Sequence, residues 1–183
     1  MALLSEEINR LRRYIEKRTE PSPENVLKKL PEGWQKIPKE LLLPHNKGRE
    51  KWAEAEYRKN GKNPEEKKHI TSRGLKVRSK SELLIAEGLY YHNIPFRYEQ
   101  VISNHRHLFS PDFTIKTKKG LVYWEHCGKM ADPGYRAYNK WKLSQYEGME
   151  IVPWENLIIT YDLSDGEFDM RIIEAEIANK LME

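Results

Sequence analysis

The segment SPDFTIKTKKGLVYWEHCGK, residues 110–129, decides the fold, because it predicts two β-strands joined by a tight turn. Side chains alternate between the two faces of a strand. One face of the first strand therefore carries apolar side chains, those of Phe109, Pro111, Phe113 and Ile115. Asp112 points to the opposite face, where strands seldom carry an acid.

The turn sets which residues of the two strands face each other. With Lys118 and Lys119 at its centre, Asp112 lies directly opposite Glu125. Their Cβ atoms would be about 5 Å apart, and like charges so close destabilise a sheet. A cation between them would reverse the effect, and two oxygen donors at this distance suit Mg²⁺ or Mn²⁺.

A third acid lies on the helix predicted for residues 79–93, which Ser79 or Ser81 would cap. The stripe of this helix that should meet the sheet contains Glu82, Ile85, Ala86 and Leu89. Carboxylates are seldom buried unless they are paired or bound to a metal. Each acid alone could form a salt bridge or a cap, but three that face inward in one fold indicate a shared site.

The remaining elements complete an α/β fold, a mixed sheet covered by helices. They are strands at 95–103, 107–117, 120–128 and 155–163 and helices at 132–148 and 169–182. In the first of these helices Asp132 is the N-cap, Pro133 lies in the first turn and Gly148 ends the helix. The order from residue 79 is helix, three strands, helix, strand, helix.

Residues 1–70 predict a basic and mostly helical region that could wrap on a domain at 71–183. Its predicted helices are 5–18, 23–30 and one that starts at residue 47 and ends near Gly61. Residues 1–80 contain 21 Lys and Arg against 12 Asp and Glu, whereas residues 81–183 contain 11 against 16. This asymmetry favours a basic arm that holds a polyanion beside an acidic working part. A solvated helical surface is the alternative.

Composition excludes several classes of protein. No apolar run is long enough to cross a bilayer, and the N-terminus is not a secretory signal. A single cysteine, Cys127, excludes an internal disulfide and a cysteine-based zinc cluster. We therefore expect a cytoplasmic protein without a membrane partner.

Three segments, VRSKSELLIAEGLYYHNIPFRYE, SPDFTI and YWEHCGKMADPGY, together resemble the PD-(D/E)XK nuclease superfamily. The resemblance covers about residues 70–180 and is similar to the branch of the TnsA-type endonucleases. It implies a restriction-endonuclease-like αβββαβ core and an Mg²⁺- or Mn²⁺-dependent phosphodiesterase, an endonuclease rather than an exonuclease, acting on DNA. Asp112 and Glu125 would hold the metal, Glu82 would complete its shell, and the backbone carbonyl of His126 would be a further ligand. The metal would activate water and offset charge on the phosphate.

The chain departs from this family at one position. The family carries a lysine two residues after the second acid, where this sequence has Cys127. Three alternatives remain: Lys142 on the following helix could reach back to the sheet, Lys129 could substitute from beyond the strand, or no lysine takes part.

Basic residues lead into the Glu82 helix: Arg73, Lys76, Arg78 and Lys80. A helix N-terminus already favours phosphate, so we expect these side chains to contact a nucleic-acid backbone. A solvated loop is the alternative. Several aromatic residues on the predicted helices could stack on bases, although such residues belong more often to the core: Tyr90, Tyr91, Tyr135, Tyr138 and Trp141.

Cys127 keeps a second hypothesis open, a catalytically impaired module of the same fold that binds nucleic acid or serves complex assembly. A homodimer or a larger DNA-processing complex is compatible with either hypothesis. The sequence does not distinguish DNA from RNA, or single from double strands.

Overall fold

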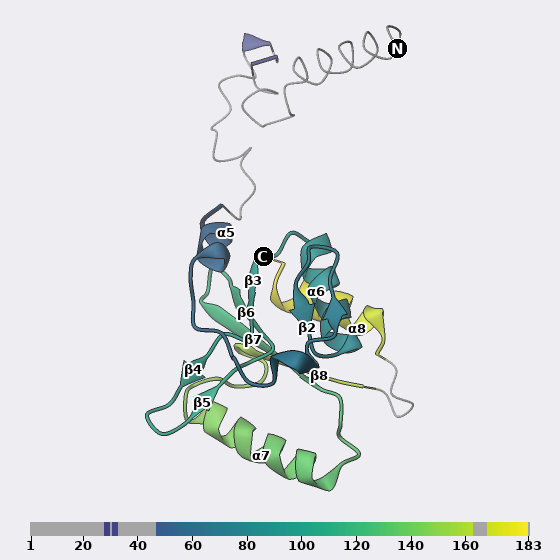
Figure 1. The fold of residues 1–183 in the computed structure, drawn as a ribbon. Helices are drawn as coiled ribbons and strands as arrows, with labels where there is room; N and C mark the ends of the chain where they lie inside the picture. The colour runs from purple at the N-terminus through teal and green to yellow at the C-terminus, as the bar shows by residue number, and fades with distance from the viewer. Residues whose placement is uncertain (1–27, 30, 33–46, 163–167, 183) are drawn as a thin grey trace, which may run out of the picture. The chain divides into compact units, whose positions relative to one another are not determined.

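The computed structural model describes residues 28–29, 31–32, 47–162 and 168–182 (Figure 1). The chain divides into two compact units, 1–47 and 48–183. The helix expected at 5–18 and most of that expected at 23–30 lie outside the described residues. The account below therefore concerns the second unit.

The described residues form an α/β protein with a four-strand mixed sheet and four helices. The helices are α5 (Lys47–Glu54), α6 (Lys80–Tyr91), α7 (Pro133–Glu147) and α8 (Met170–Lys180), with a 3₁₀ turn η1 (Pro64–Glu66). The strands are β1 (His69–Ile70), β2 (Lys76–Val77), β3 (Phe96–Tyr98), β4 (Ile102–Ser103), β5 (Leu108–Phe109), β6 (Phe113–Lys116), β7 (Leu121–Cys127) and β8 (Leu157–Tyr161).

The main sheet has the strand order β3-β6-β7-β8, antiparallel except for the parallel pair β7 and β8. The β6–β7 hairpin has the predicted register, with Phe113 paired with Trp124. Its turn runs from Thr117 to Gly120, and Gly120 has a φ of 140°, which favours glycine. In the same register Asp112 and Glu125 are the next opposite positions beyond the last pair.

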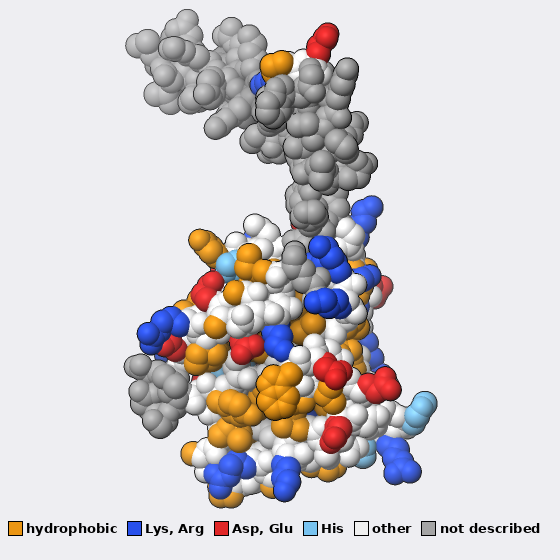
Figure 2. All heavy atoms as spheres, turned by 180° about the vertical axis from the view of Figure 1, so that it is seen from behind, with side chains coloured by type: hydrophobic (Ala, Val, Ile, Leu, Met, Phe, Trp, Pro, Cys, Tyr) orange, Lys and Arg blue, Asp and Glu red, His pale blue; other side chains and the backbone are white. Residues whose placement is uncertain are grey.

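The helices cover the two faces of the sheet (Figure 1). α6 and α8 pack on one face, where they bury Phe113, Ile115 and Trp124 in the larger core. α7 packs on the other face, in a smaller core that includes its Tyr146. Ser79 caps α6 and Asp132 caps α7, as the sequence predicts. On the face in Figure 2, acidic and basic side chains of the described residues are interspersed with hydrophobic ones.

Two strands that the sequence predicts as continuous are broken. The predicted strand at 95–103 divides into β3 and β4, because Glu99 has a φ of 48°, outside the strand region. The predicted strand at 107–117 divides into β5 and β6 at Pro111, which has no N–H to donate to a ladder. β4 and β5 pair with each other as a separate two-strand sheet.

This break changes the position of Phe109, which we had expected on the face of Phe113. Phe109 lies on β5 and packs instead in the smaller core with Tyr146. Asp112 is therefore not inside a continuous strand but in the connection just before β6, where a side chain can reach a cleft.

The N-terminal part of the described fold also differs from the expectation. The helix predicted to run from residue 47 to near Gly61 ends at Glu54. The compact unit begins at Gly48, so residues 48–70 belong to it, although we had expected a boundary at residue 71. None of the helices in the described residues is long and apolar enough to span a membrane.

Candidate functional site

Asp112 and Glu125 lie together on the side of the sheet that α7 covers. The backbone N–H of His126 donates to Asp112 Oδ2 at 2.7 Å, which fixes this carboxylate against β7. Glu125 is buried within β7 and accepts a hydrogen bond from the hydroxyl of Tyr146 on α7. The hairpin and α7 thus position two carboxylates at one place.

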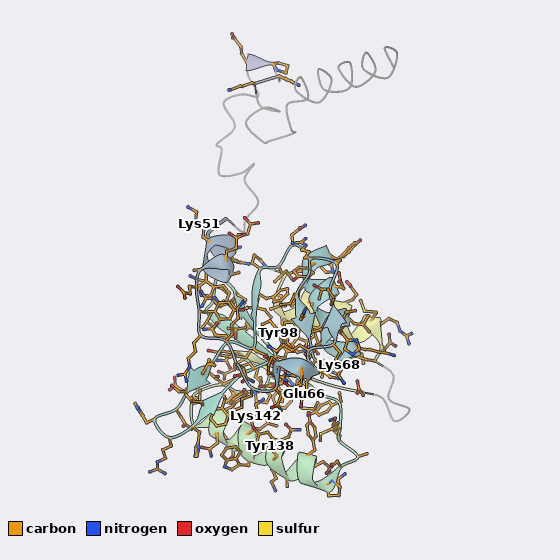
Figure 3. The ribbon with its side chains drawn as sticks, viewed as in Figure 1. Lys51, Glu66, Lys68, Tyr98, Tyr138 and Lys142 are labelled. Atoms are coloured by element: carbon orange, nitrogen blue, oxygen red, sulfur yellow. The ribbon has the colours of Figure 1, made fainter. Side chains whose placement is uncertain are left out.

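Lys142 reaches the same place from α7. Its Nζ lies 2.7 Å from Glu125 Oε1, and its side chain is largely buried. Lys142 and Tyr146 are four residues apart, so they lie on one side of the helix and contact the same oxygen. Tyr138, one turn earlier, lies next to Lys142 along α7 (Figure 3).

The charges of Asp112, Glu125 and Lys142 lie close together and shift the pKa values of their neighbours. Burial, followed by the charges of Glu125 and Glu82, raises the pKa of Asp112 well above its ordinary value. Burial alone would lower the pKa of Lys142, but the carboxylates of Glu125 and Asp112 outweigh it and raise this pKa. Lys142 therefore stays charged at neutral pH and offsets part of the repulsion between the acids.

The other candidates for the lysine role are placed differently. Cys127 is buried, and burial followed by the charges of Glu125 and Asp112 raises its pKa to about 12. Its thiol is therefore protonated at neutral pH and supplies no positive charge. Lys129 is exposed and lies beyond the end of β7, where no described carboxylate pairs with it.

Glu82 is buried on the inward stripe of α6, as its pattern predicts, but its oxygens already have partners. Glu82 Oε2 accepts from the backbone N–H of Arg78 at 3.0 Å and from the hydroxyl of Tyr98 at 2.6 Å. Oε1 is 3.0 Å from the hydroxyl of Ser79, the cap of the helix. Its charge still acts on Asp112, but its hydrogen bonds hold the start of α6.

His126 turns its ring to the opposite face of the sheet from Glu125, as strand alternation requires. Its Nε2 is 2.8 Å from Asp162 Oδ1 and its Nδ1 is 3.0 Å from the hydroxyl of Thr160. Asp162 also accepts from the hydroxyl of Ser81 on α6 at 2.8 Å. This network fixes the backbone of His126, the same backbone whose N–H holds Asp112.

A cleft of about 490 Å³ opens beside Asp112. Its lining includes Arg58, Lys59, Lys62, Arg78, Glu99, Phe109, Asp112, Tyr138 and Lys142. Five of these residues are basic and two are acidic, so the lining of the cleft carries more positive than negative charge. Residues 58–62, which lie before the segment that the resemblance covers, form a large part of it.

Of the four basic residues expected to contact nucleic acid, only Arg78 lines this cleft, and its charge is used internally. Arg78 pairs with Glu99 and Glu66 and donates to the backbone carbonyl of Lys62. Arg73 lies over the ring of Tyr90 at 4.5 Å. Lys76 and Lys80 are exposed, and neither lines the cleft.

The oxygen donors fit a hard divalent cation, but they are few. Within residues 28–29, 31–32, 47–162 and 168–182, no group of three or more His, Cys, Asp or Glu side chains could hold a metal ion. Asp112 and Glu125 remain as the carboxylate donors at this place, and the resemblance adds the backbone carbonyl of His126. Such a set suits Mg²⁺, which usually binds one or two carboxylates and keeps its other positions for water and substrate.

Comparisons with protein-family models, with curated proteins and with solved structures found no match. Sequence reasoning did not identify Tyr146, Tyr98 or the segment 58–62 as parts of the site. The position of Tyr146, four residues after Lys142, is a signal that could have identified it. No local pattern points to Tyr98 or to residues 58–62, because only tertiary packing brings them there.

Proposed function

We propose that this chain is a nuclease of the PD-(D/E)XK type with a restriction-endonuclease-like core. It hydrolyses phosphodiester bonds, in DNA, with Mg²⁺ or Mn²⁺. The observation that carries the proposal is the ion pair of Lys142 and Glu125 beside Asp112, at the wall of a basic cleft.

The order of the elements supports the proposal. α6, β3, β6, β7, α7 and β8 follow one another as αβββαβ, with β4 and β5 inserted between β3 and β6. Asp112 precedes the second strand of this core, and Glu125 lies in the third. These are the positions that the resemblance assigns to the two acids.

The residues of the site suit phosphodiester hydrolysis. Asp112 and Glu125, with the carbonyl of His126, would hold the divalent cation, which supplies a Lewis acid for the reacting phosphate. Lys142 holds a proton and a positive charge beside Glu125, where it can orient a water and offset negative charge that develops on the phosphate. The basic residues of the cleft hold the neighbouring phosphates. Lys142 thus takes the role of the lysine that Cys127 replaces.

Incubation of supercoiled plasmid with the purified protein in Mg²⁺, Mn²⁺ or EDTA tests the proposal. A closed circle has no ends, so nicking or linearisation identifies an endonuclease. We expect cleavage that requires the metal and disappears in Asp112→Ala. Glu147→Ala, which removes an exposed acid at the end of α7, is the matched control and should cleave normally. Cleavage that persists in Asp112→Ala would contradict the proposal.

The alternative is a catalytically impaired module that binds nucleic acid. It is favoured by the engagement of Glu82 in hydrogen bonds, which leaves two carboxylates for a metal. In the same experiment this module would shift the plasmid on a gel without cutting it under any metal condition.

A further inference from the structure

The cleft beside Asp112 has two walls of different chemistry. Residues 58–62 form the cationic wall, which presents Arg58, Lys59 and Lys62. The exposed side of α7 forms the aromatic wall, where Tyr138 lines the cleft and Trp141 packs beside it with 5.7 Å between ring centroids. Neither wall is explained by metal binding or by the pairing of Lys142.

Hydrogen bonds hold the backbone of the cationic wall in place, while its basic side chains lie at the cleft. Arg58 accepts a hydrogen bond from the N–H of Val101 at 2.9 Å, and Asn60 donates to the carbonyl of Glu99 at 3.0 Å. Both segments thus pair like neighbouring strands. In the described part of the chain, no carboxylate pairs with the side chains of the three basic residues of this wall, and all three side chains are exposed or at the cleft.

The neighbouring basic residues behave differently, and they serve as a comparison within the molecule. Lys67 and Arg78 both pair with Glu99, which is buried. Arg78 also pairs with Glu66, so two acids of the fold neutralise these two cations. The cationic wall has no carboxylate partner among the described residues, although Lys59 lies over the ring of Tyr57 at 5.0 Å. Its positive charge is therefore not neutralised by an acid and can attract the phosphates of a ligand.

The aromatic wall exposes more ring surface than packing requires. Tyr138 is 52% exposed and Trp141 is 40% exposed. Trp141 rests on Phe109, with 5.7 Å between ring centroids, and on His107, with 5.3 Å. Trp141 thus packs against these two rings, while part of its own ring remains exposed to solvent. Large exposed aromatic side chains beside a charged groove are suited to stack on a planar ligand.

We propose that the cleft binds a single-stranded nucleic acid, a free strand or an unpaired end, with its phosphates on the cationic wall and its bases on Tyr138 and Trp141. A basic groove combined with aromatic platforms is how proteins bind single strands with little sequence preference. Bases within a duplex stack on each other and offer no free face to the aromatic wall. The inference rests on the proposed nuclease function, and it specifies the substrate of that same site.

Binding can be measured without chemistry by fluorescence anisotropy in EDTA. The probes are a labelled DNA strand of about 20 nucleotides that forms no hairpin, the duplex of the same sequence, and the RNA strand of the same sequence. We expect a single strand to bind at least tenfold more tightly than the duplex. Whether the DNA or the RNA strand binds more tightly identifies the polymer.

Variants distinguish the contributions of the cationic wall and the aromatic wall to binding. Tyr138→Ala should weaken single-strand binding about tenfold and leave duplex binding unchanged, because it removes one stacking surface. Arg58→Glu combined with Lys62→Glu should weaken binding of all three probes. Tyr91→Ala, at an exposed tyrosine of α6, and Lys118→Glu, in the β6–β7 turn, are the matched controls and should bind normally.

Equal affinity for single strand and duplex would overturn the inference. Unchanged single-strand binding by Tyr138→Ala and by Trp141→Leu would also overturn it; a thermal melt verifies that both variants are folded. The inference and the proposed function can fail separately. Metal-dependent cleavage of duplex alone would contradict the inference and support the proposed nuclease function. Tight single-strand binding without cleavage would support the inference and contradict the nuclease function.

Discussion

Lys142, on helix α7, brings a positive charge to the carboxylates of Asp112 and Glu125, whereas the resemblance expects this charge from a strand residue. Its Nζ is 2.7 Å from Glu125 Oε1. Against burial, which lowers it, the charges of Glu125 and then Asp112 raise the pKa of Lys142. Lys142→Ala would therefore remove both the partner of a buried acid and the charge available to the reacting phosphate. We expect single-turnover cleavage at saturating Mg²⁺ to fall about 100-fold or more.

Lys140→Ala is the control for this variant, since Lys140 lies on the exposed side of the same helix and pairs with no described acid. It should cleave at the normal rate. If Lys142→Ala also cleaved normally, the lysine would be structural, and Lys129→Ala would become the next variant to measure.

Cys127 occupies the position at which the resemblance expects a lysine. It shares a face with Glu125. Burial, followed by the charges of Glu125 and Asp112, raises the pKa of its thiol. We predict that Cys127→Ser leaves cleavage unchanged, because a protonated thiol supplies no charge. We also predict that Cys127→Lys restores cleavage about tenfold in the Lys142→Ala background, because it returns a cation to the same face.

The double variant has a clear opposite outcome in the same cleavage assay. If Lys142→Ala combined with Cys127→Lys is folded but recovers nothing, the site needs the cation at the position of Lys142, and charge on the face alone is insufficient.

At the scale of the elements, the start of α6 depends on Glu82. This side chain accepts from the N–H of Arg78 and from the hydroxyl of Tyr98 inside the fold. Glu82→Ala would leave the hydroxyl of Tyr98 without its acceptor, and the N–H of Arg78 with only its longer contact, 3.2 Å to the hydroxyl oxygen of Tyr98. We therefore expect a loss of about 2 kcal/mol in the free energy of unfolding. Thermal melts should show the same loss in EDTA and in Mg²⁺.

Asp112→Asn is the comparison for this prediction, because it retains the size of the side chain and removes the charge of a proposed ligand. Mg²⁺ should raise the melting temperature of the native protein and not that of Asp112→Asn. If the Mg²⁺ effect also disappeared in Glu82→Ala, Glu82 would be a metal ligand, as the sequence led us to expect, and its role would not be structural alone.

Local signals explain why much of the fold could be predicted from sequence. The caps Ser79 and Asp132 and the Lys118–Lys119 turn act within a few residues, so they fix two helices and one register. The breaks at Glu99 and Pro111 were not predicted. At Glu99 the backbone leaves β3 to pair with residues 58–60, which lie far away in sequence.

The candidate site also contains residues that the sequence predicts and residues that it does not. Alternation along the hairpin predicts that Asp112 and Glu125 converge, and helical spacing places Lys142 on the inward side of α7. The hydrogen bonds of Glu82 could not be predicted, because Tyr98 reaches it across the core. The cationic wall could not be predicted either, because only pairing with residues 99–101, far away in sequence, brings residues 58–60 to the site.

At the scale of the whole molecule, the segment 48–68 is part of the described fold and supports the edge strand β3. Arg97 of β3 donates to the carbonyl of Trp52 and lies 4.3 Å from the centre of its ring. The hydroxyl of Tyr57 exchanges hydrogen bonds with the backbone of Tyr98. Lys67 pairs with the buried Glu99. These contacts join the segment to the strand that precedes the site.

Two truncations test this arrangement. Removal of residues 1–47 should leave the melting temperature unchanged, because residues 48–183 form a compact unit and Trp52 and Tyr57, the described partners of β3 from the segment 48–68, belong to it. Removal of residues 1–68 should cost about 3 kcal/mol or more, because it takes away the partner of Arg97 and one partner of the buried Glu99. It also removes the cationic wall, so the shorter protein should lose binding to nucleic acid. Equal melting temperatures for the two truncated proteins would contradict this assignment and would return the boundary to residue 71.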